Sequence, residues 1–550
     1  MQMKRLSLVK RPEADKVEYL EGNSKSPQTA RWLETPAGSE STVWTEKEMP
    51  KNLGDPLRSP EIGSMSSERT IHRKAEAVVE VGPADSTRSV GKPRTGGSGG
   101  RGSERIRETS PGHSDRTRMS TKLIRIAEKA RKDQKLRFNN LAHLITPEFL
   151  METWKQMNQK ATSGVDGESM QAYGRELETR VKDLCERLRA NRYKAPPVRR
   201  VRIPKPGKSG EKRPLGIPTV EDRLLQRAVA RILEAVYEQD FLSFSYGFRL
   251  GRNPHHALKA LRDIVVTKRV RHVYEADLRG YFNHINHEWL RKMVAHRIAD
   301  PVILRLMGKW LRAGVMEDGV VVRMEEGSPQ GGPISPILSN VYLHYALDLW
   351  FEKVWKKHCQ GEAYLTRFAD DYVACFQYKR DAESFHRTSG MRLERFGLEL
   401  ASEKTRILLF GRFARERKAV YGERPETFEF LGFKHVCGVD HQGKFALVRI
   451  PSMKSCRKFL DKTHEWLKGH QHWKRRDQQK ELRMRLRGFY QYFSLHCCKP
   501  KLGWIRGQVQ WQWIRVLRRR SQRHRLYWCY LQSRSWFELP YVVGTLHPTV

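Results

Sequence analysis

The stretch Tyr364-Leu-Thr-Arg-Phe-Ala-Asp-Asp-Tyr-Val-Ala-Cys-Phe376 places two aspartates side by side between two short apolar segments. Alternating β-branched and aromatic residues on both sides predict a hairpin with Asp370 and Asp371 at its tight turn. Adjacent carboxylates repel each other, and they are stable together mainly when a hard cation such as Mg²⁺ shares them. Aspartate is also a common turn former, so this stretch alone leaves a purely structural role open.

The composition indicates a large, basic protein. Its 550 residues are enough for two or three domains. The chain has 103 Lys and Arg residues against 62 Asp and Glu, a net charge of +41, which indicates a polyanionic partner. The 14 Trp, 18 Tyr and 21 Phe among these charges favour nucleic acid over an acidic membrane surface, because bases offer faces for stacking.

Two observations bear on the location of the protein. No apolar run approaches the ~20 residues that span a bilayer. The first ten residues are basic but lack the apolar core of a secretory signal. We therefore expect a cytoplasmic, nucleoid-associated protein of a bacterium, without a membrane partner.

The cysteines do not show the spacing of a metal site or a redox motif, and no Cys-x-x-Cys is present. This pattern predicts free thiols in a reducing compartment and no zinc site. The eight residues are Cys185, Cys359, Cys375, Cys437, Cys456, Cys497, Cys498 and Cys529.

Residues 1–117 lack apolar periodicity and are rich in Ser, Gly, Pro, Arg and Glu, which predicts a disordered N-terminal extension. It is either an inert, solvated tail or a weak RNA-binding segment. Order is expected to begin near Thr121. Thr146 and Thr219 are predicted to cap two helices, and apolar residues within 224–236 predict a buried face on the second.

A second acidic position stands out at a strand end. The segment 271–282 predicts a buried strand that ends at Asp277 and then turns through Gly280. Asp277 and Asp370 are therefore compatible with convergence from neighbouring strands of one sheet. Two Mg²⁺ ions held by such acids clamp the attacking and leaving oxygens of a phosphoryl displacement. Asp277 by itself would be an ordinary aspartate at a strand end.

Eight segments, in one order along the chain, together resemble group II intron reverse transcriptases, which also act as maturases. Any one segment would be a weak indication. In chain order they are Thr162-Ser-Gly-Val-Asp-Gly167, residues 212–226, Ser245-Tyr-Gly-Phe-Arg-Leu-Gly-Arg252, Asp277-Leu-Arg-Gly-Tyr-Phe-Asn-His-Ile285, Gly327-Ser-Pro-Gln-Gly-Gly-Pro-Ile-Ser-Pro-Ile-Leu-Ser-Asn340, the Phe-Ala-Asp-Asp box, Gly397-Leu-Glu-Leu-Ala-Ser-Glu-Lys-Thr405 and Phe430-Leu-Gly-Phe433.

The resemblance implies an α+β right-hand polymerase, with an antiparallel sheet in the fingers and palm and an α-helical thumb or maturase domain after them. The implied domains are the extension (1–117), fingers and palm (118–435), the thumb (436–535) and a short C-terminal tail without an endonuclease (536–550). The absent His-Asn-His endonuclease argues against autonomous second-strand DNA cleavage.

The implied function is RNA-directed DNA synthesis by a group II intron-encoded enzyme that copies intron RNA and assists splicing and mobility. Its implied cofactors are two Mg²⁺ ions, which Mn²⁺ could replace. The partners would be intron RNA, an RNA template, a DNA primer or target, and dNTPs. The oligomeric state is left open, a dimer included. Two alternatives also stay open: a splicing maturase with an idle polymerase site, and a domesticated reverse transcriptase in defence or repair.

The resemblance also implies roles for individual residues. Asp277, Asp370 and Asp371 would be catalytic and would contact the metal ions together with Leu278. Lys404 resembles a proposed proton donor to the departing pyrophosphate.

Further residues resemble those that contact the nucleotide and the primer. Phe282 would exclude a 2′-hydroxyl, or else simply pack in the core. Lys205 and Arg213 would contact the triphosphate, or else belong to a solvated basic face. The nucleotide pocket would be lined by Gln330, Gly331 and Gly332. The primer grip, for which an apolar turn is the plain alternative, would be Phe430, Leu431, Gly432 and Phe433.

Two positions depart from the family pattern. Phe368 stands where a tyrosine is usual, which keeps the ring and removes a hydroxyl, and we expect little effect on metal binding. Asn283 stands where many relatives carry aspartate, so any charge at that position is missing.

Overall fold

The computed structural model describes residues 121–204, 212–317, 320–322, 327, 331–414, 424–520 and 526–542. The chain divides into two compact units, Met1–Glu104 and Arg105–Val550, and all described residues belong to the second. The predicted N-terminal extension, 1–117, lies outside the described residues.

The first described elements are mostly helical. They are α1 (Thr121–Lys132), α2 (Pro147–Lys155), α3 (Met170–Arg175), α4 (Leu177–Arg189), β1 (Val198–Pro204), β2 (Lys212–Ile217) and α5 (Val220–Tyr237). Both predicted caps are confirmed. The Thr146 hydroxyl accepts a hydrogen bond from the Phe149 N–H, and the Thr219 hydroxyl accepts one from the Asp222 N–H, at 3.3 Å each. These bonds satisfy N–H groups that have no partner inside the helix.

The middle of the chain alternates helices and strands. Its elements are α6 (Pro254–Thr267), β3 (His272–Ala276), α7 (His287–Ala295), α8 (Pro301–Arg312), β4 (Val315–Glu317), β5 (Val320–Val322), α9 (Ser335–Leu343), a π-helix (His344–Asp348), α10 (Leu349–Lys353), β6 (Ala363–Phe368), β7 (Asp371–Phe376), α11 (Lys379–Glu394) and β8 (Arg406–Leu409).

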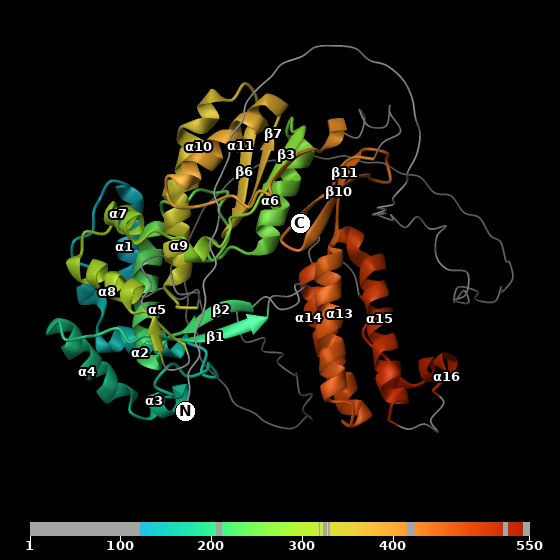
Figure 1. Cartoon of the computed structure of the whole chain (residues 1–550), viewed down its shortest axis with the longest axis horizontal. Coiled ribbons are helices and arrows are strands. Elements are labelled where there is room, and N and C mark those ends of the chain that lie inside the picture. Colours follow the sequence, from blue (N-terminus) through green and yellow to red (C-terminus); the bar gives the residue numbers. More distant parts are fainter. Residues whose placement is uncertain are drawn as a thin grey trace, which may run out of the picture. The chain divides into compact units, whose positions relative to one another are not determined.

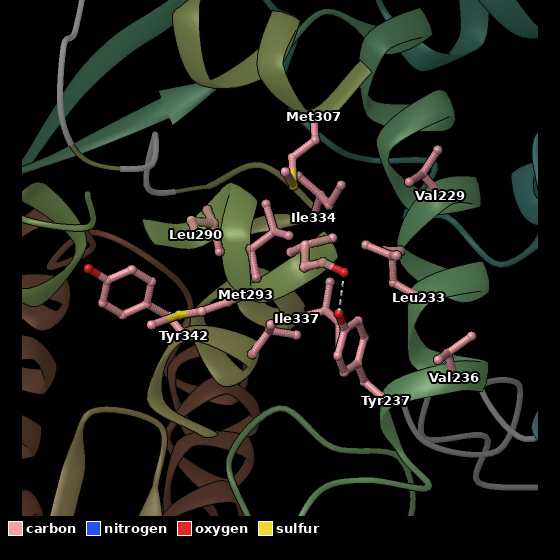
Figure 2. Packing of buried hydrophobic residues seen from close by; sticks show 14 of the residues in the cluster. Val229, Leu233, Val236, Tyr237, Leu290, Met293, Met307, Ile334, Ile337 and Tyr342 are labelled. Atoms are coloured by element: carbon pink, nitrogen blue, oxygen red, sulfur yellow. Dashed lines mark hydrogen bonds between the residues drawn. The ribbon is translucent and has the colours of Figure 1, made fainter. Parts of the chain in front are cut away.

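Helix α5 is the centre of the larger hydrophobic cluster, as its apolar spacing predicts. Its apolar side chains are buried on almost every side, and Figure 2 shows them facing side chains of α7, α8 and α9. The Tyr237 hydroxyl lies inside this cluster and donates a hydrogen bond to the Val294 carbonyl at 3.0 Å. Burial of a tyrosine is tolerable here because its polar end has a partner.

Strands β1, β2, β4 and β5 form a first sheet in the order β2-β1-β4-β5. Strand β1 pairs antiparallel with β2 and parallel with β4. Its basic side chains are not all free for a partner. The Glu317 carboxylate on β4 pairs with Arg200 at 3.2 Å and with Arg202 at 2.6 Å.

The second sheet has the order β6-β7-β3-β8, and every neighbouring pair is antiparallel. Alternate side chains face opposite layers, as the two-residue period of a strand requires. Tyr274 and Tyr372 join the cluster that includes α11, whereas Val273 and Val373 join the one that includes α6. The sheet is therefore covered on both faces, and Figure 1 shows α6 and α11 beside its strands.

A buried ion pair lies where the second sheet meets α9 and the π-helix. The Arg367 guanidinium on β6 is fully buried and contacts the Asp348 carboxylate with both its Nε, at 2.7 Å, and one terminal nitrogen, at 2.5 Å. The same group donates to the Ser245 hydroxyl at 2.8 Å, the Asn340 side-chain carbonyl at 3.1 Å and the Ala369 carbonyl at 2.9 Å. All of its donors thus have acceptors, which a buried guanidinium requires.

The C-terminal part consists of a third sheet and a helical group. Its elements are β9 (Phe428–Phe430), β10 (Phe433–Val439), β11 (Phe445–Pro451), α13 (Met453–Gly469), α14 (Arg475–Phe493), α15 (Lys499–Arg518) and α16 (Trp528–Gln532). Figure 1 shows α13, α14 and α15 side by side. The apolar side chains of α14 between Leu482 and Phe493 are buried against the neighbouring elements. The fold is thus mixed α/β, with mainly antiparallel strands and many helices.

None of the helices in the described part of the chain combines the length and the apolar character needed to cross a membrane.

Replacing Arg367 by methionine should strongly destabilise the fold, because it leaves the Asp348 carboxylate buried without its cation. We expect a loss of about 3–5 kcal/mol in the free energy of unfolding, measured by urea denaturation. The control is Arg262→Met, which removes an exposed pair with Asp263 and should cost no more than about 1 kcal/mol. Equal losses in the two variants would contradict this account.

The buried His344 should make the fold sensitive to acid. Burial, and then the charge of Arg367, lower its pKa to about 4, against the opposing effect of Asp348. An unfolded histidine titrates near pH ~6.5, so protons bind preferentially to the unfolded chain. The stabilisation by neutral His344 is complete above that pH and is lost as the pH falls toward 4.

We therefore expect His344→Gln to reduce the drop in melting temperature between pH 7.5 and pH 5. His143→Gln, a change at an exposed histidine, is the control and should leave the drop unchanged. An identical drop in the wild type and both variants would rule out His344 as a source of acid sensitivity.

Candidate active site

A tight hairpin turn joins β6 to β7 at the two aspartates. Phe368 pairs with Asp371, so Ala369 and Asp370 are the two turn residues. The prediction that both acids lie in the turn is therefore corrected: Asp371 is the first residue of β7. Ala369 has a φ of +57°, which is unfavourable for a residue with a side chain. The Arg367 hydrogen bond to its carbonyl helps to hold it in this conformation.

Gly247 supports the turn from the other side. A Cβ atom added there would lie 2.2 Å from the Ala369 nitrogen, which leaves no space for any side chain. The Asn340 amide fixes the same glycine by donating to its carbonyl at 2.7 Å. A glycine at position 247 is therefore required for the close approach of the two backbone segments.

The register of the sheet brings Asp277 to the same place. Ala276 pairs with Tyr372, so Asp277, which follows Ala276, and Asp371, which precedes Tyr372, lie at the same end of the antiparallel pair. The Leu278 side chain is buried and its backbone bridges to Leu400. In the structure the strand ends at residues 277 and 370 therefore converge, as predicted.

The electrostatics reflect this closeness. Burial among protein atoms, and then the charges of Asp370 and Asp277, raise the pKa of Asp371 to about 7. Lys404 lowers it, but not enough to cancel these effects. The Asp371 side chain is nevertheless exposed to solvent. Its carboxyl group is therefore surrounded by many protein atoms without being closed off from water. Three acids in this setting form a local concentration of negative charge.

Lys404 lies beside Asp277 because the backbone brings it there. The Ala401 N–H donates to the Asp277 carbonyl at 2.9 Å, and the Lys404 N–H donates back to the Ala401 carbonyl at 2.9 Å. The Lys404 ammonium group then contacts the Asp277 carboxylate. That hydrogen bond is the largest cause of a raised pKa for Lys404, which keeps the amine charged.

The predicted nucleotide residues are only partly described. Lys205, Gln330 and the Arg213 side chain lie outside the described part. Phe282 is half-buried in a short helix just after Asp277, with its ring 5.2 Å from that of Tyr281.

Two glycines of the predicted pocket are closely packed, one against backbone and one against a side chain. Gly331 has a φ of +122°, and a Cβ atom there would lie 2.3 Å from the Gly216 carbonyl on β2. A Cβ atom at Gly332 would lie 2.5 Å from the Gln226 side-chain oxygen. The positive φ and the backbone contact explain why position 331 needs glycine, whereas a Cβ atom at position 332 would displace the Gln226 side chain.

The predicted primer-grip segment is a two-residue turn between β9 and β10. Phe430 pairs with Phe433, and both Leu431 (φ +50°) and Gly432 (φ +79°) are left-handed, as in a tight hairpin of type I′. The Tyr492 hydroxyl on α14 donates to the Leu431 carbonyl at 2.9 Å. The Asp371 charge contributes to the raised pKa of Tyr492, to about 12, after burial.

Sequence reasoning did not identify Tyr492, Gly247, Asn340 or the partner of Arg367. Gly247 and Asn340 lie in segments that carry the resemblance, but nothing in the sequence indicates that they meet the aspartate turn. Tyr492 lies in the apolar stretch of α14, where no local signal distinguishes it from a core residue.

The donor set has the chemistry that a hard divalent cation requires, because all three acids offer carboxylate oxygens. Within the described residues, however, no three Asp, Glu, His or Cys side chains are arranged so that they could hold a metal ion. Asp277 is instead bonded to Lys404. Cation binding at these acids would therefore require Asp277 to exchange its lysine partner.

Comparison with known proteins agrees with this geometry. Residues 203–435 match the model of the family described as "Reverse transcriptase (RNA-dependent DNA polymerase)". The chain is 40% identical over 228 residues to Protein YkfC of Escherichia coli, which covers 40% of this chain and 59% of that protein. It is also 40% identical over 167 residues to the Group II intron-encoded protein LtrA of Lactococcus lactis, which covers 30% and 27%.

A more distant relative is Nuclear intron maturase 3, mitochondrial, of Arabidopsis thaliana, at 29% identity over 129 residues, or 23% of this chain and 18% of that protein. The chain thus spans less than two thirds of each of these three relatives. Residues 203–435 thus match the reverse transcriptase family, and the chain is similar to group II intron-encoded proteins and intron maturases.

Proposed function

We propose that this chain is an RNA-directed DNA polymerase encoded by a group II intron, which copies intron RNA into DNA and binds that RNA to assist splicing and mobility. One observation carries the proposal: Asp370 and Asp371 are held beside Asp277 where β3 ends and β7 begins, inside the segment that matches the reverse transcriptase family. Nucleotidyl transfer needs such a concentration of carboxylates.

The architecture supports a right-hand arrangement. The first sheet and its helices would be the fingers and the second sheet the palm, within residues 118–435. Helices α13, α14 and α15 would be the thumb or maturase domain, within 436–535. Residues 536–550 would be a C-terminal tail.

Asp277, Asp370 and Asp371 would hold the cations, with the backbone at Leu278 beside them. When bound, two Mg²⁺ ions, or Mn²⁺ in their place, would activate a primer 3′-hydroxyl and offset the charge of the triphosphate. The side chains themselves contribute negative charge that the scaffold keeps together. Lys404 stays charged while it is paired with Asp277, and it would be able to give a proton to pyrophosphate only after leaving that carboxylate.

The substrate contacts follow from the neighbouring segments. Phe282 is close to Asp277 along the chain and would exclude a ribose 2′-hydroxyl. Gln330 and Gly331 would line the nucleotide pocket, and Lys205 and Arg213 would contact the triphosphate of a dNTP. The turn from Phe430 to Phe433 would grip the primer, since Tyr492 links it to the neighbourhood of Asp371.

Binding of intron RNA, of an RNA template and of a DNA primer or target is supported by charge and exposed rings. The net charge is +41. Toward the C-terminus, cations lie over exposed rings: Lys501 over Trp504 at 4.4 Å, and Arg534 over Tyr530 at 4.4 Å. Such surfaces suit stacked bases and phosphates, and the affinity should fall steeply with salt. The protein would act in the cytoplasm at the nucleoid, alone or as a dimer.

Two other functions use the same scaffold. A maturase with an idle polymerase site would need RNA binding alone. The presence of Asp277, Asp370 and Asp371 side by side gives no reason to expect an inactive polymerase site. A domesticated reverse transcriptase in defence or repair would keep the chemistry and lose the intron, so RNA recovered with the purified protein distinguishes it.

Asp370→Ala should abolish primer extension on an RNA template, because it removes a carboxylate from the proposed cation site. We expect a loss of at least about 10²-fold in rate, with intron RNA binding and splicing assistance largely retained. Asp263→Ala, at an exposed aspartate of α6, is the control. If Asp370→Ala extended primers at the normal rate, the site assignment would be wrong.

Phe282→Ala should weaken selection against ribonucleotides, because a smaller side chain leaves space for the 2′-hydroxyl. The ratio of kcat/KM for dNTP to that for rNTP should fall about 10-fold or more. Phe244→Ala shortens a partly buried phenylalanine packed against the same hydrophobic cluster and should leave the ratio unchanged. An unaltered ratio in Phe282→Ala would assign that ring to core packing.

A further inference from the structure

A network of buried polar side chains lies behind the glycine pair at 331 and 332, and no role was predicted for it. Its centre is Asp222, on the first turn of α5, which is buried. The Asp222 carboxylate accepts hydrogen bonds from the Tyr193 hydroxyl, from the Trp310 indole at 2.7 Å and from the Gln226 amide at 3.0 Å. Burial is the largest effect on this carboxyl group and raises its pKa to about 6, so it is ionised at neutral pH.

These bonds determine which way the Gln226 amide points. An ionised carboxylate only accepts hydrogen bonds, so the NH₂ group of Gln226 must face Asp222. Its oxygen then faces the opposite direction, toward Gly332, where an added Cβ atom would lie only 2.5 Å away. This oxygen is buried and has no hydrogen-bond partner among the described residues, and leaving a buried acceptor in that state is costly.

The glycine pair is held from two directions. On one side Gly331 packs against the backbone of β2, where the Gly216 carbonyl blocks any side chain. On the other side Gly332 packs against Gln226 of α5. Since β2 leads directly into α5, both contacts come from one continuous segment. The turn at residues 331 and 332 therefore packs against both the first sheet and α5.

The same place contains a small internal cavity. It is about 10 Å³ in volume, and its lining includes Gln226, Gly332 and Ser335 together with Met307 and Ile334, two residues that Figure 2 shows in the neighbouring core. Ligand sites are far larger, about 300 Å³ or more. A nucleotide cannot enter, so Gln226 cannot act by touching substrate.

We propose that Gln226 is a positioning residue that sets the place of the Gly331–Gly332 turn, and through it the affinity for the incoming nucleotide. The inference rests on the proposed polymerase function, in which this turn lines the nucleotide pocket. Asp222, Tyr193 and Trp310 hold the amide in one orientation, and the amide oxygen packs against Gly332 of the turn. Replacing the amide removes its bond to Asp222 and changes its packing against Gly332, which should loosen the turn while leaving the acidic residues untouched.

The test is Gln226→Met in the full chain, with steady-state incorporation of single dNTPs on an RNA template. Methionine keeps the length of the side chain and removes the amide. We expect the altered packing against Gly332 to raise the KM for dNTP about fivefold, with kcat within about twofold and primer–template affinity unchanged. Gln239→Met, just beyond the end of α5, is the matched control. A general loss of packing would instead lower the melting temperature and kcat.

A second pair of variants tests the contact itself. Gly332→Ala adds a methyl group that collides with the Gln226 oxygen and should raise the KM for dNTP. Gln226→Ala removes the obstacle, so the double variant should have a lower KM than Gly332→Ala alone. Independent effects of the two changes on KM would contradict direct contact between them.

Hydrogen exchange of a peptide covering residues 331–338 gives a measurement that does not need activity. Gln226→Met should increase its exchange, and Gln239→Met should not. Unchanged exchange with an unchanged KM overturns the inference while the polymerase assignment stands. Absence of templated synthesis by the wild type overturns the polymerase assignment and the effect on nucleotide affinity, and exchange then decides only whether Gln226 holds the turn.

Discussion

The ion pair between Arg367 and Asp348 is the interaction on which the candidate site depends. One fully buried guanidinium joins the π-helix through Asp348, the segment before α6 through Ser245, and the aspartate turn through the Ala369 carbonyl. A buried ion pair gives little net stability on its own. Here it fixes the geometry of a turn formed by a left-handed Ala369 and by Asp370, which is followed directly by a second acid, Asp371.

The acids are kept together by a scaffold that does not neutralise them fully. The second sheet is packed on both faces, so the strand ends cannot move apart to relieve repulsion. The cation in contact with Asp277 is Lys404, and the pKa of Asp371 stays raised in its presence. Tyr492 of α14 is close enough to Asp371 for that charge to raise its pKa. A movement of the C-terminal helices would therefore change the surroundings of the acids. This arrangement suits a site in which the Lys404 ammonium group gives way at Asp277 to bound metal cations.

Some of this could be predicted because the signals are local. Thr146 and Thr219 cap helices through bonds that span three residues, and the two-residue period of β3 and β7 follows from their own side chains. It could be inferred that Asp277 and Asp370 lie close together, because each stands at the end of an apolar strand. The sequence could not tell that Asp371 opens β7, since the turn depends on Gly247 and Arg367. Nor could it pair Arg367 with Asp348, because the bond depends on where a π-helix lies against the sheet. The roles of Lys205, Arg213 and Gln330 remain predictions from resemblance.

The central claim is that Asp277, Asp370 and Asp371 share a divalent cation, and iron-mediated backbone cleavage tests it most directly. Fe²⁺ replaces Mg²⁺ in oxygen-ligand sites, where it reduces added hydrogen peroxide to hydroxyl radicals that cut the chain beside the bound ion, and ascorbate returns the resulting Fe³⁺ to Fe²⁺. The account predicts cuts near residues 277 and 370, suppressed by excess Mg²⁺ and lost in Asp370→Ala. Cuts confined to other segments, or cuts at these positions that Mg²⁺ does not suppress, would contradict it.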